Sequence, residues 1–248
     1  TWIGQSPLRG NNERAVITQS DAGTWGWMKT PWGEYRIYPG SDHDWIAEKP
    51  LMNIAPTFSG GDAIPAPDDD PRIPIPKGIP TFESPFMVQK ALTAKAAPAP
   101  AFVADVMILY TDDIATKLGA GLMPMLYNLI ATNNLALADS EVALSLRLVN
   151  ATKINLPNTA GSSDTLSSMA GSAGSNIAFF QGLSHGAGSL RDQVGADFVA
   201  LVRDGPTDTG GIAFVLKNPT PGVLSSTAAH SVNNFCAGGC ESIFAHEL

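Results

Sequence analysis

The end of the chain places an imidazole next to a carboxylate in an arrangement that could serve hydrolysis. His246 is followed directly by Glu247 at the end of an apolar segment that we expect to be a helix. In the motif H-E-x-x-H, two histidines on one helix face bind one Zn²⁺, and the glutamate acts as general base on the metal-bound water. Glu247 is thus the candidate base and His246 the candidate zinc ligand. The second histidine would come four residues after His246, beyond Leu248.

The same ending can also arise in a protein that binds no metal. In an arbitrary protein, a terminal His-Glu-Leu is a partly exposed helix end. The sequence Ala-His-Glu-Leu also resembles an endoplasmic-reticulum retention signal, but it lacks the acidic residue that K/H-D-E-L requires before the glutamate, so a retention signal is rejected. Taken alone, the pair is therefore weak evidence for a metal site.

Other residues that could bind metal give weaker signals. Cys236 and Cys240 could form a disulfide with each other or with a cysteine after residue 248, and a zinc site is less favoured because the chain has no second pair. His43, His185 and His230 have no second histidine at helical spacing. The acidic run at 68–70 indicates a solvated loop, since three adjacent carboxylates do not converge on Ca²⁺. Structural calcium is left open.

The candidate groups must be positioned by a region, residues 101–248, whose pattern is that of an α/β protein. Residues 102–110 are almost continuously apolar, and residues 123–138 carry apolar side chains at helical spacing. Further strands are expected at 142–149, 197–202 and 211–216, short helices at 165–169 and 188–194, and a final helix at the end. This order predicts a mixed sheet packed with helices.

The first hundred residues differ from this pattern. Residues 1–50 contain all five tryptophans and alternate bulky and small residues between Gly and Pro turns, which predicts a small β-rich module. Residues 51–100 are rich in proline, and the Ala-Pro repeats at 91–100 indicate an extended linker. The fold class is therefore α+β or α/β, with a β-rich module before the mixed sheet.

Composition excludes two classes of partner. The chain has 248 residues, and its 23 acidic against 15 basic residues argue against nucleic-acid binding, which needs a basic face. No apolar run approaches the ~20 residues of a membrane span, so no membrane partner is predicted. The abundance of small and polar residues is typical of secreted bacterial proteins. Because the chain begins at Thr1 without a leader, we expect either that a signal was removed or that the sequence is a piece of a longer protein.

Several segments of 103–248, in their order and spacing, resemble a known catalytic domain. They are the strand ending at Thr111, the helix with Asn133 and Asn134, the segment 190–201, the run 210–214 and the ending 244–248. Together they resemble the metzincin zinc endopeptidases, specifically the bacterial reprolysin-like branch that includes peptidyl-Asp metalloendopeptidases. The resemblance implies that further zinc ligands and a Met-containing turn follow residue 248, and that this chain alone is inactive as a peptidase.

The resemblance also implies a substrate site and an inhibitor. Gly211, Ile212, Ala213 and Phe214 correspond to an edge strand above the cleft, where a protein or peptide substrate pairs by β-augmentation; an ordinary edge strand is the competing interpretation. The module 1–50, through residues 1–4, 15–18 and 33–37, resembles the β-rich propeptide of secreted bacterial metzincins, which assists folding and acts as an intramolecular inhibitor. Asp62 ends a segment near the F-x-G-D of astacin propeptides, whose Asp caps the zinc, but the segment is one residue too long, and a Gly-rich turn is the simpler interpretation.

These observations lead to one expected function and one alternative. We expect the chain to be the precursor of a secreted zinc endopeptidase. Cleavage within 91–100 would remove the propeptide from the catalytic domain. The alternative is a non-catalytic secreted module that binds or inhibits peptides. The coding sequence after residue 248 distinguishes the two, because only the enzyme needs two more histidines there.

Overall fold

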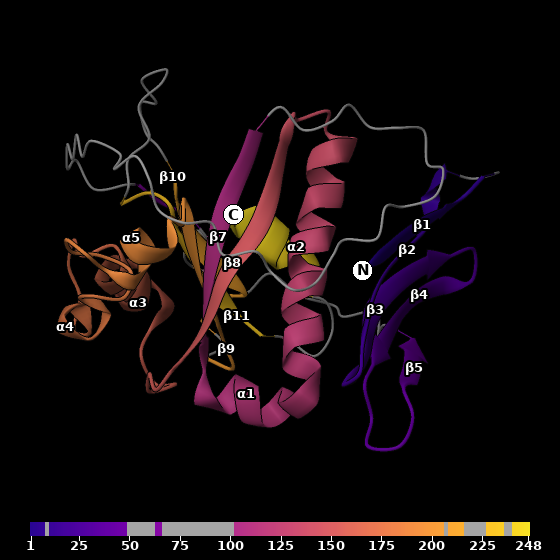
Figure 1. Ribbon diagram of the computed structural model, residues 1–248, viewed down its shortest axis with the longest axis horizontal. Helices are drawn as coiled ribbons and strands as arrows, with labels where there is room; N and C mark the ends of the chain where they lie inside the picture. Colours follow the sequence, from indigo (N-terminus) through magenta and orange to yellow (C-terminus); the bar gives the residue numbers. More distant parts are fainter. Residues whose placement is uncertain (8–9, 49–62, 66–101, 206–207, 216–226, 236–239) are drawn as a thin grey trace.

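The computed structural model consists of two β-sheets with a long helix between them (Figure 1). It describes residues 1–7, 10–48, 63–65, 102–205, 208–215, 227–235 and 240–248. The N-terminal sheet has five strands and the larger, mixed sheet has six. This architecture confirms the expected fold class, a β-rich N-terminal module followed by a mixed sheet packed with helices. Apart from 63–65, the proline-rich segment 51–100 lies outside the described residues.

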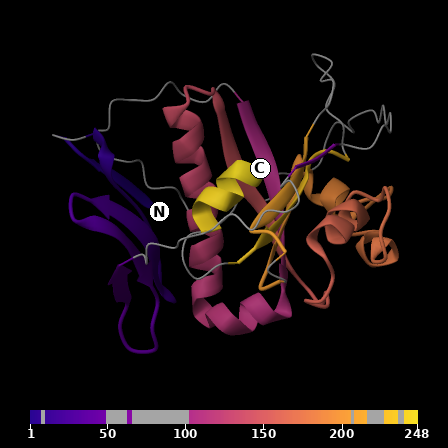
Figure 2. The same ribbon diagram turned by 180° about the vertical axis from the view of Figure 1, so that it is seen from behind.

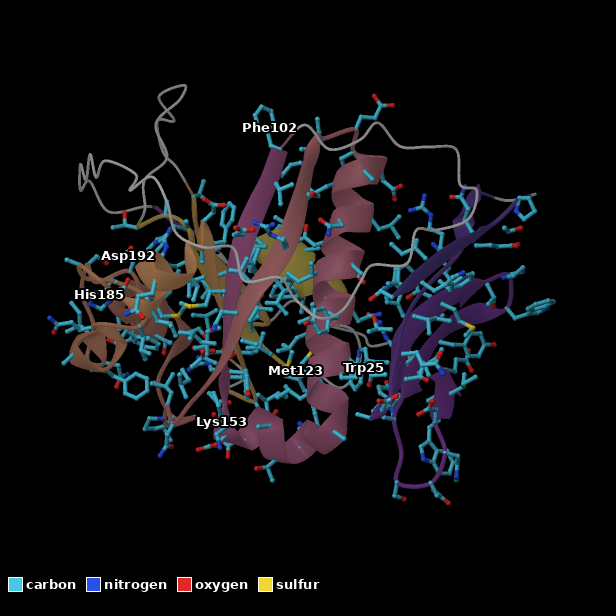
Figure 3. All side chains as sticks on the ribbon, in the orientation of Figure 1. Trp25, Phe102, Met123, Lys153, His185 and Asp192 are labelled. Carbon is cyan, nitrogen blue, oxygen red and sulfur yellow. The ribbon has the colours of Figure 1, made fainter. Side chains whose placement is uncertain are left out.

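The N-terminal sheet is an antiparallel meander. Its strands β1 to β5 lie side by side in chain order; they are β1 (Trp2–Ser6), β2 (Gly10–Ser20), β3 (Gly23–Thr30), β4 (Gly33–Tyr38) and β5 (Trp45–Glu48). Gly23 opens β3 with a φ of +114°, a conformation that side chains with a Cβ rarely adopt, so the tight turn before it needs glycine. One face of this sheet packs on the long helix α2 (Leu122–Asp139), with Trp25 pointing toward that helix (Figure 3).

The larger sheet has the order β6-β10-β11-β9-β7-β8. Its strands are β6 (Ala63–Pro65), β7 (Phe102–Thr111), β8 (Leu144–Ile154), β9 (Phe198–Arg203), β10 (Gly211–Val215) and β11 (His230–Asn234). Strands β8, β7, β9 and β11 run parallel, whereas β10 is antiparallel to β11. The apolar run of β7 lies inside this sheet, and its residues Val106 to Leu109 are fully buried, as expected for a strand covered on both faces.

Helices cover the two faces of the larger sheet. On one face lie α2 and α6 (Cys240–Glu247), and on the other lie α3 (Ser162–Met169), α4 (Ile177–Phe180) and α5 (Leu190–Val194) (Figures 1 and 2). Alternate residues of β7 therefore enter two cores. Val106 and Ile108 pack with Leu126 of α2 and Phe244 of α6, while Met107 and Leu109 pack with residues of α3 and α4. The helix α1 (Asp112–Leu118) and a 3-10 turn (Gly119–Gly121) lead from β7 into α2.

The helical stretch Asp112–Asp139 meets, by length and mean hydropathy alone, the requirements of a membrane span. Half of its most apolar window is buried inside the molecule. Leu126 and Leu129 pack on the larger sheet, and Asn128 is completely buried against the N-terminal sheet. Packing between the two sheets therefore accounts for the apolar character of this helix.

Candidate active site

The helix α6 carries the His-Glu pair and is anchored by its apolar side. It contacts α2, β11 and β10, and Phe244 is fully buried in the core shared with α2. Consecutive residues of a helix point in different directions, so the two candidate residues have different surroundings. His246 is exposed, whereas Glu247 is buried, with 8% of its surface accessible. Glu247 therefore points into the fold, toward the start of β10.

The start of β10 lies against this helix because two glycines allow it. A Cβ built on Gly211 would lie 2.6 Å from Cγ and 2.8 Å from Oε1 of Glu247. A Cβ on Gly210 would lie 2.8 Å from Cδ1 of Ile243, on the preceding turn of α6. Contacts this short do not occur for real Cβ atoms, so any larger residue would separate the helix from the strand. The Gly-Gly pair thus sets the distance between Glu247 and β10.

A buried amide side chain fixes the backbone that enters β10. Asn234, at the end of β11, donates from its Nδ2 to the carbonyl oxygen of Thr209 at 2.7 Å, and its backbone N–H donates to Gly210 O at 2.9 Å. The Thr209 hydroxyl donates to Gly211 O at 2.6 Å. These bonds hold residues 209–211 from one side while α6 packs from the other.

Arg203, fully buried at the end of β9, orients Asn234 in turn. Its Nε donates to Asn234 Oδ1 at 2.8 Å, its Nη2 to Ser162 Oγ at 2.9 Å, and its Nη1 to the carbonyl oxygen of Ala160. Burial lowers the pKa of the Arg203 guanidinium, partly offset by the charge of Asp208. This network joins β9, β11, the start of α3 and the entry to β10.

The carboxylate of Asp208, at the exposed rim, completes the network. It accepts hydrogen bonds from Ser162 N and Ser162 Oγ, both at 2.8 Å. Burial by itself raises the pKa of this carboxyl, but the hydrogen bonds from Ser162 and Thr209 and the charge of Arg203 outweigh it and lower the pKa. No member of this network belongs to a motif that can be recognised in the sequence. In the sequence, the one feature that could have pointed to this network is Arg203, an arginine at the end of the apolar strand β9.

On the side away from β11, β10 pairs with another strand of the same chain. The expectation was that Gly211, Ile212, Ala213 and Phe214 would form an edge strand. The structure places them in β10, but β6 pairs with β10 in parallel, opposing Ala63 to Ala213 and Ile64 to Phe214. In the described chain β10 is therefore not an edge strand, because three residues of the proline-rich segment extend the sheet by β-augmentation. The pairing of these residues with a substrate stays a prediction.

The remaining candidate residues lie apart from this arrangement. Cys236 and Asp62 fall outside the described residues, and Cys240 begins α6 with its side chain not described, so the disulfide and the Asp62 switch stay predictions. Within the described ranges, no three His, Cys, Asp or Glu side chains gather as a metal site. Around α6, the described part of the chain offers zinc the imidazole of His246, whereas a catalytic zinc takes three protein ligands. Zinc therefore does not fit these residues alone.

Two other histidines lie on the opposite face of the sheet. His230 begins β11, where its Nδ1 lies 3.0 Å from Thr227 O and its Nε2 lies 3.3 Å from Ser184 O. Burial, helped by the charge of Arg191, lowers the pKa of His230 to about 4. His185 lies beside the short helices (Figure 3), with Nδ1 3.3 Å from Met169 O. Both rings therefore face backbone carbonyls, which points to a structural role.

Comparisons with known proteins give distant structural likenesses. No family model matches the chain, and no curated protein matches it. The solved structures that resemble it include a chaperone–substrate complex, at 12% identity and TM-score 0.46, and metalloproteinase-II from Bacteroides fragilis, at 13% identity and TM-score 0.44. The alignments cover 94% and 99% of this chain but 31% and 72% of those chains. One distant neighbour is thus a metalloproteinase, but at TM-scores below 0.5 neither likeness carries an assignment.

Proposed function

We propose that this chain is part of the precursor of a secreted zinc endopeptidase that cleaves peptide bonds. The proposal rests on one observation: the buried carboxylate of Glu247 lies against Gly211, the first residue of β10. Further along, β10 pairs with the extended backbone of β6 on the side away from β11. A peptide paired with β10 would bring its own backbone close to a carboxylate. A base beside a backbone-binding strand is the arrangement that peptide hydrolysis needs.

In this proposal Glu247 takes the proton of the attacking water and passes it to the leaving amine. Its burial and its close approach to Gly211 limit how far the carboxylate can move. A zinc ion held with the help of His246 would polarise the scissile carbonyl. His246 would be the ligand on this helix, and the remaining ligands would have to come from outside the described residues. Secretion and the role of the propeptide-like N-terminal module as an intramolecular inhibitor are part of the same proposal.

The test is the variant Glu247→Gln in the full-length protein. We expect peptide cleavage to fall by about 10²–10⁴-fold, because a proton acceptor is lost, while zinc content stays unchanged. The matched control is Glu141→Gln, which alters an exposed glutamate in the turn after α2. Undiminished cleavage by Glu247→Gln would refute the role of this residue.

A non-catalytic peptide-binding or inhibitory module is the second candidate. The pairing of β6 with β10 favours it, because β-augmentation binds a peptide without requiring a metal. The two candidates differ in the coding sequence after residue 248. Two further histidines at the spacing Gly-His-x-x-Gly-x-x-His favour the enzyme, and their absence favours the binding module.

A further inference from the structure

Two parts of the N-terminal region contact the rest of the molecule at two separate places. The sheet β1–β5 packs on α2, and β6 pairs with β10 across the larger sheet (Figure 1). The segment 49–62 joins these two parts, and residues 66–101 join β6 to the larger-sheet region. A cut within 66–101 would therefore leave the N-terminal sheet and β6 on one piece.

Hydrogen bonds and an ion pair join the N-terminal sheet to α2. Trp27 Nε1 donates to Thr132 Oγ1 at 2.9 Å, and Asn128 Nδ2 donates to the carbonyl oxygen of Val16 at 3.1 Å. At the end of the helix, Arg14 forms an ion pair with Asp139. These bonds span the helix from its middle to its C-terminus, so they fix both the position and the direction of the sheet on α2.

The same contact also has an apolar centre. Trp25 is 5% exposed and belongs to the core cluster that includes Leu126 and Phe244. Its ring centroid lies 5.4 Å from that of Tyr38 and 6.4 Å from that of Phe235. Burial of a tryptophan contributes a large share of the stability of an interface. The sheet is thus part of the core on the face that carries α6.

The contact of β6 with β10 is small by comparison. It spans three residue pairs, and Pro65 has no backbone N–H to donate. A strand of this length cannot hold an extended partner alone, since even a two-stranded hairpin is only marginally stable in water. The occupancy of β10 must therefore depend on what keeps β6 nearby.

We propose that residues 1–65 are a bivalent ligand of residues 102–248, in which the sheet β1–β5 is the anchor and β6 is the blocking strand. Anchoring on α2 keeps β6 close to β10 through the segment 49–62, which raises its effective concentration. Cutting the chain between residues 66 and 101 then releases neither part. With an unaltered β6, the edge of β10 opens when the sheet leaves α2. That the blocking of β10 would regulate a peptidase rests on the proposed function, whereas the binding of residues 1–65 to residues 102–248 does not.

The experiment uses the full chain with a recognition sequence for a specific protease inserted between Ala97 and Pro98. After the cut, we expect both pieces to elute together in size-exclusion chromatography. The double variant Arg14→Gln, Trp27→Phe weakens the anchor and should let the pieces separate at concentrations where the unaltered pieces stay together. The matched control Arg147→Gln removes an ion pair with Asp105, away from the interface, and should leave them together.

Amide hydrogen exchange of β10 reports on the blocking strand. Exchange in Gly211–Val215 should be the same before and after the cut, and should accelerate by about 100-fold once the anchor is lost. The variant Ile64→Pro should accelerate it while the cut piece stays bound. Separation of the unaltered pieces after the cut would overturn the proposal. So would fast exchange of β10 in the cut chain with an unaltered β6 and the sheet still bound. Neither readout uses peptidase activity, so a failed Glu247 test would leave it standing.

Discussion

Glu247 lies directly against the backbone of Gly211, which leaves no room for a side chain on that residue. The two residues are far apart in sequence, and each belongs to an element that the sequence already indicated: the terminal helix and the short strand after the Gly-Gly pair. Their contact places the candidate base at the start of the strand that carries β6. The contact can be tested by substituting Gly211.

The variant Gly211→Ala should push α6 away from β10. Because the new methyl group would overlap Cγ of Glu247, we expect the free energy of unfolding to fall by about 1–3 kcal/mol. Urea denaturation measures this change. Gly161→Ala is the control, since a Cβ there meets only one atom, at 3.9 Å. Equal stabilities for the two variants would contradict the packing described for α6.

The Asp208 carboxylate should make part of the free energy of unfolding depend on pH in the acidic range. Its pKa is lowered in the folded state, so the stability it contributes is present above its ordinary pKa and is lost as pH falls through the lowered value. At neutral pH, Asp208→Asn should cost about 0.5–1 kcal/mol, a small amount because the carboxylate is exposed and screened. The difference from the unaltered chain should disappear once the pH falls below the lowered pKa of Asp208. Thermal unfolding followed against pH tests this, and a constant difference would contradict it.

His230 should give a second pH dependence, at higher pH. Its folded pKa of about 4 lies below the ordinary value of 6.5, so the unfolded chain binds more protons between these values. Stability should therefore fall as pH decreases from about 6.5 to about 4, by up to about 3 kcal/mol, and this contribution should not change further below that. In His230→Gln the fall over this range should be absent. Denaturant midpoints measured across the range decide the point, and an unchanged fall would exclude His230 as its source.

The hydrogen bond between Trp27 and Thr132 should couple the N-terminal sheet to α2. We expect Trp27→Phe and Thr132→Val each to lower the free energy of unfolding by about 1 kcal/mol. The double variant should lose about 0.5–1 kcal/mol less than the two losses added together, because the same bond is removed in both cases. A double-mutant cycle by chemical denaturation measures the coupling. Strictly additive losses would mean that the bond contributes nothing to docking.

The elements with a clear hydrophobic pattern could be predicted from the sequence. The apolar run after residue 101 became β7, and the helical spacing at 123–138 became α2. The alternating strands between Gly and Pro turns became the meander of β2, β3 and β4. In each case the side chains themselves specify the element, because one face or both faces must be buried. The Gly-Gly pair before β10 was also visible, although its reason, contact with α6, was not.

Two strands could not be predicted in this way. The sequence of β11, His-Ser-Val-Asn-Asn, has little strand propensity, yet all five residues are buried. Asn234 is tolerated there because Arg203, Thr209 and Ser162 supply hydrogen-bond partners from other elements. His230 lies within hydrogen-bond distance of the carbonyl oxygens of Thr227 and Ser184. β6 ends in a proline within a proline-rich segment and forms only because β10 offers it a free ladder.

The sequence by itself determined the types of chemical group and the local elements that carry them: a His-Glu pair on a terminal helix, a short strand entered through two glycines, and a β-rich module at the other end. The tertiary structure alone decided that Glu247 points at Gly211 and that β6 covers β10. It also decided that the N-terminal sheet is anchored on α2. The reason is physical: local patterns report which faces are buried, whereas contacts between distant segments depend on which surfaces complement each other once those elements pack.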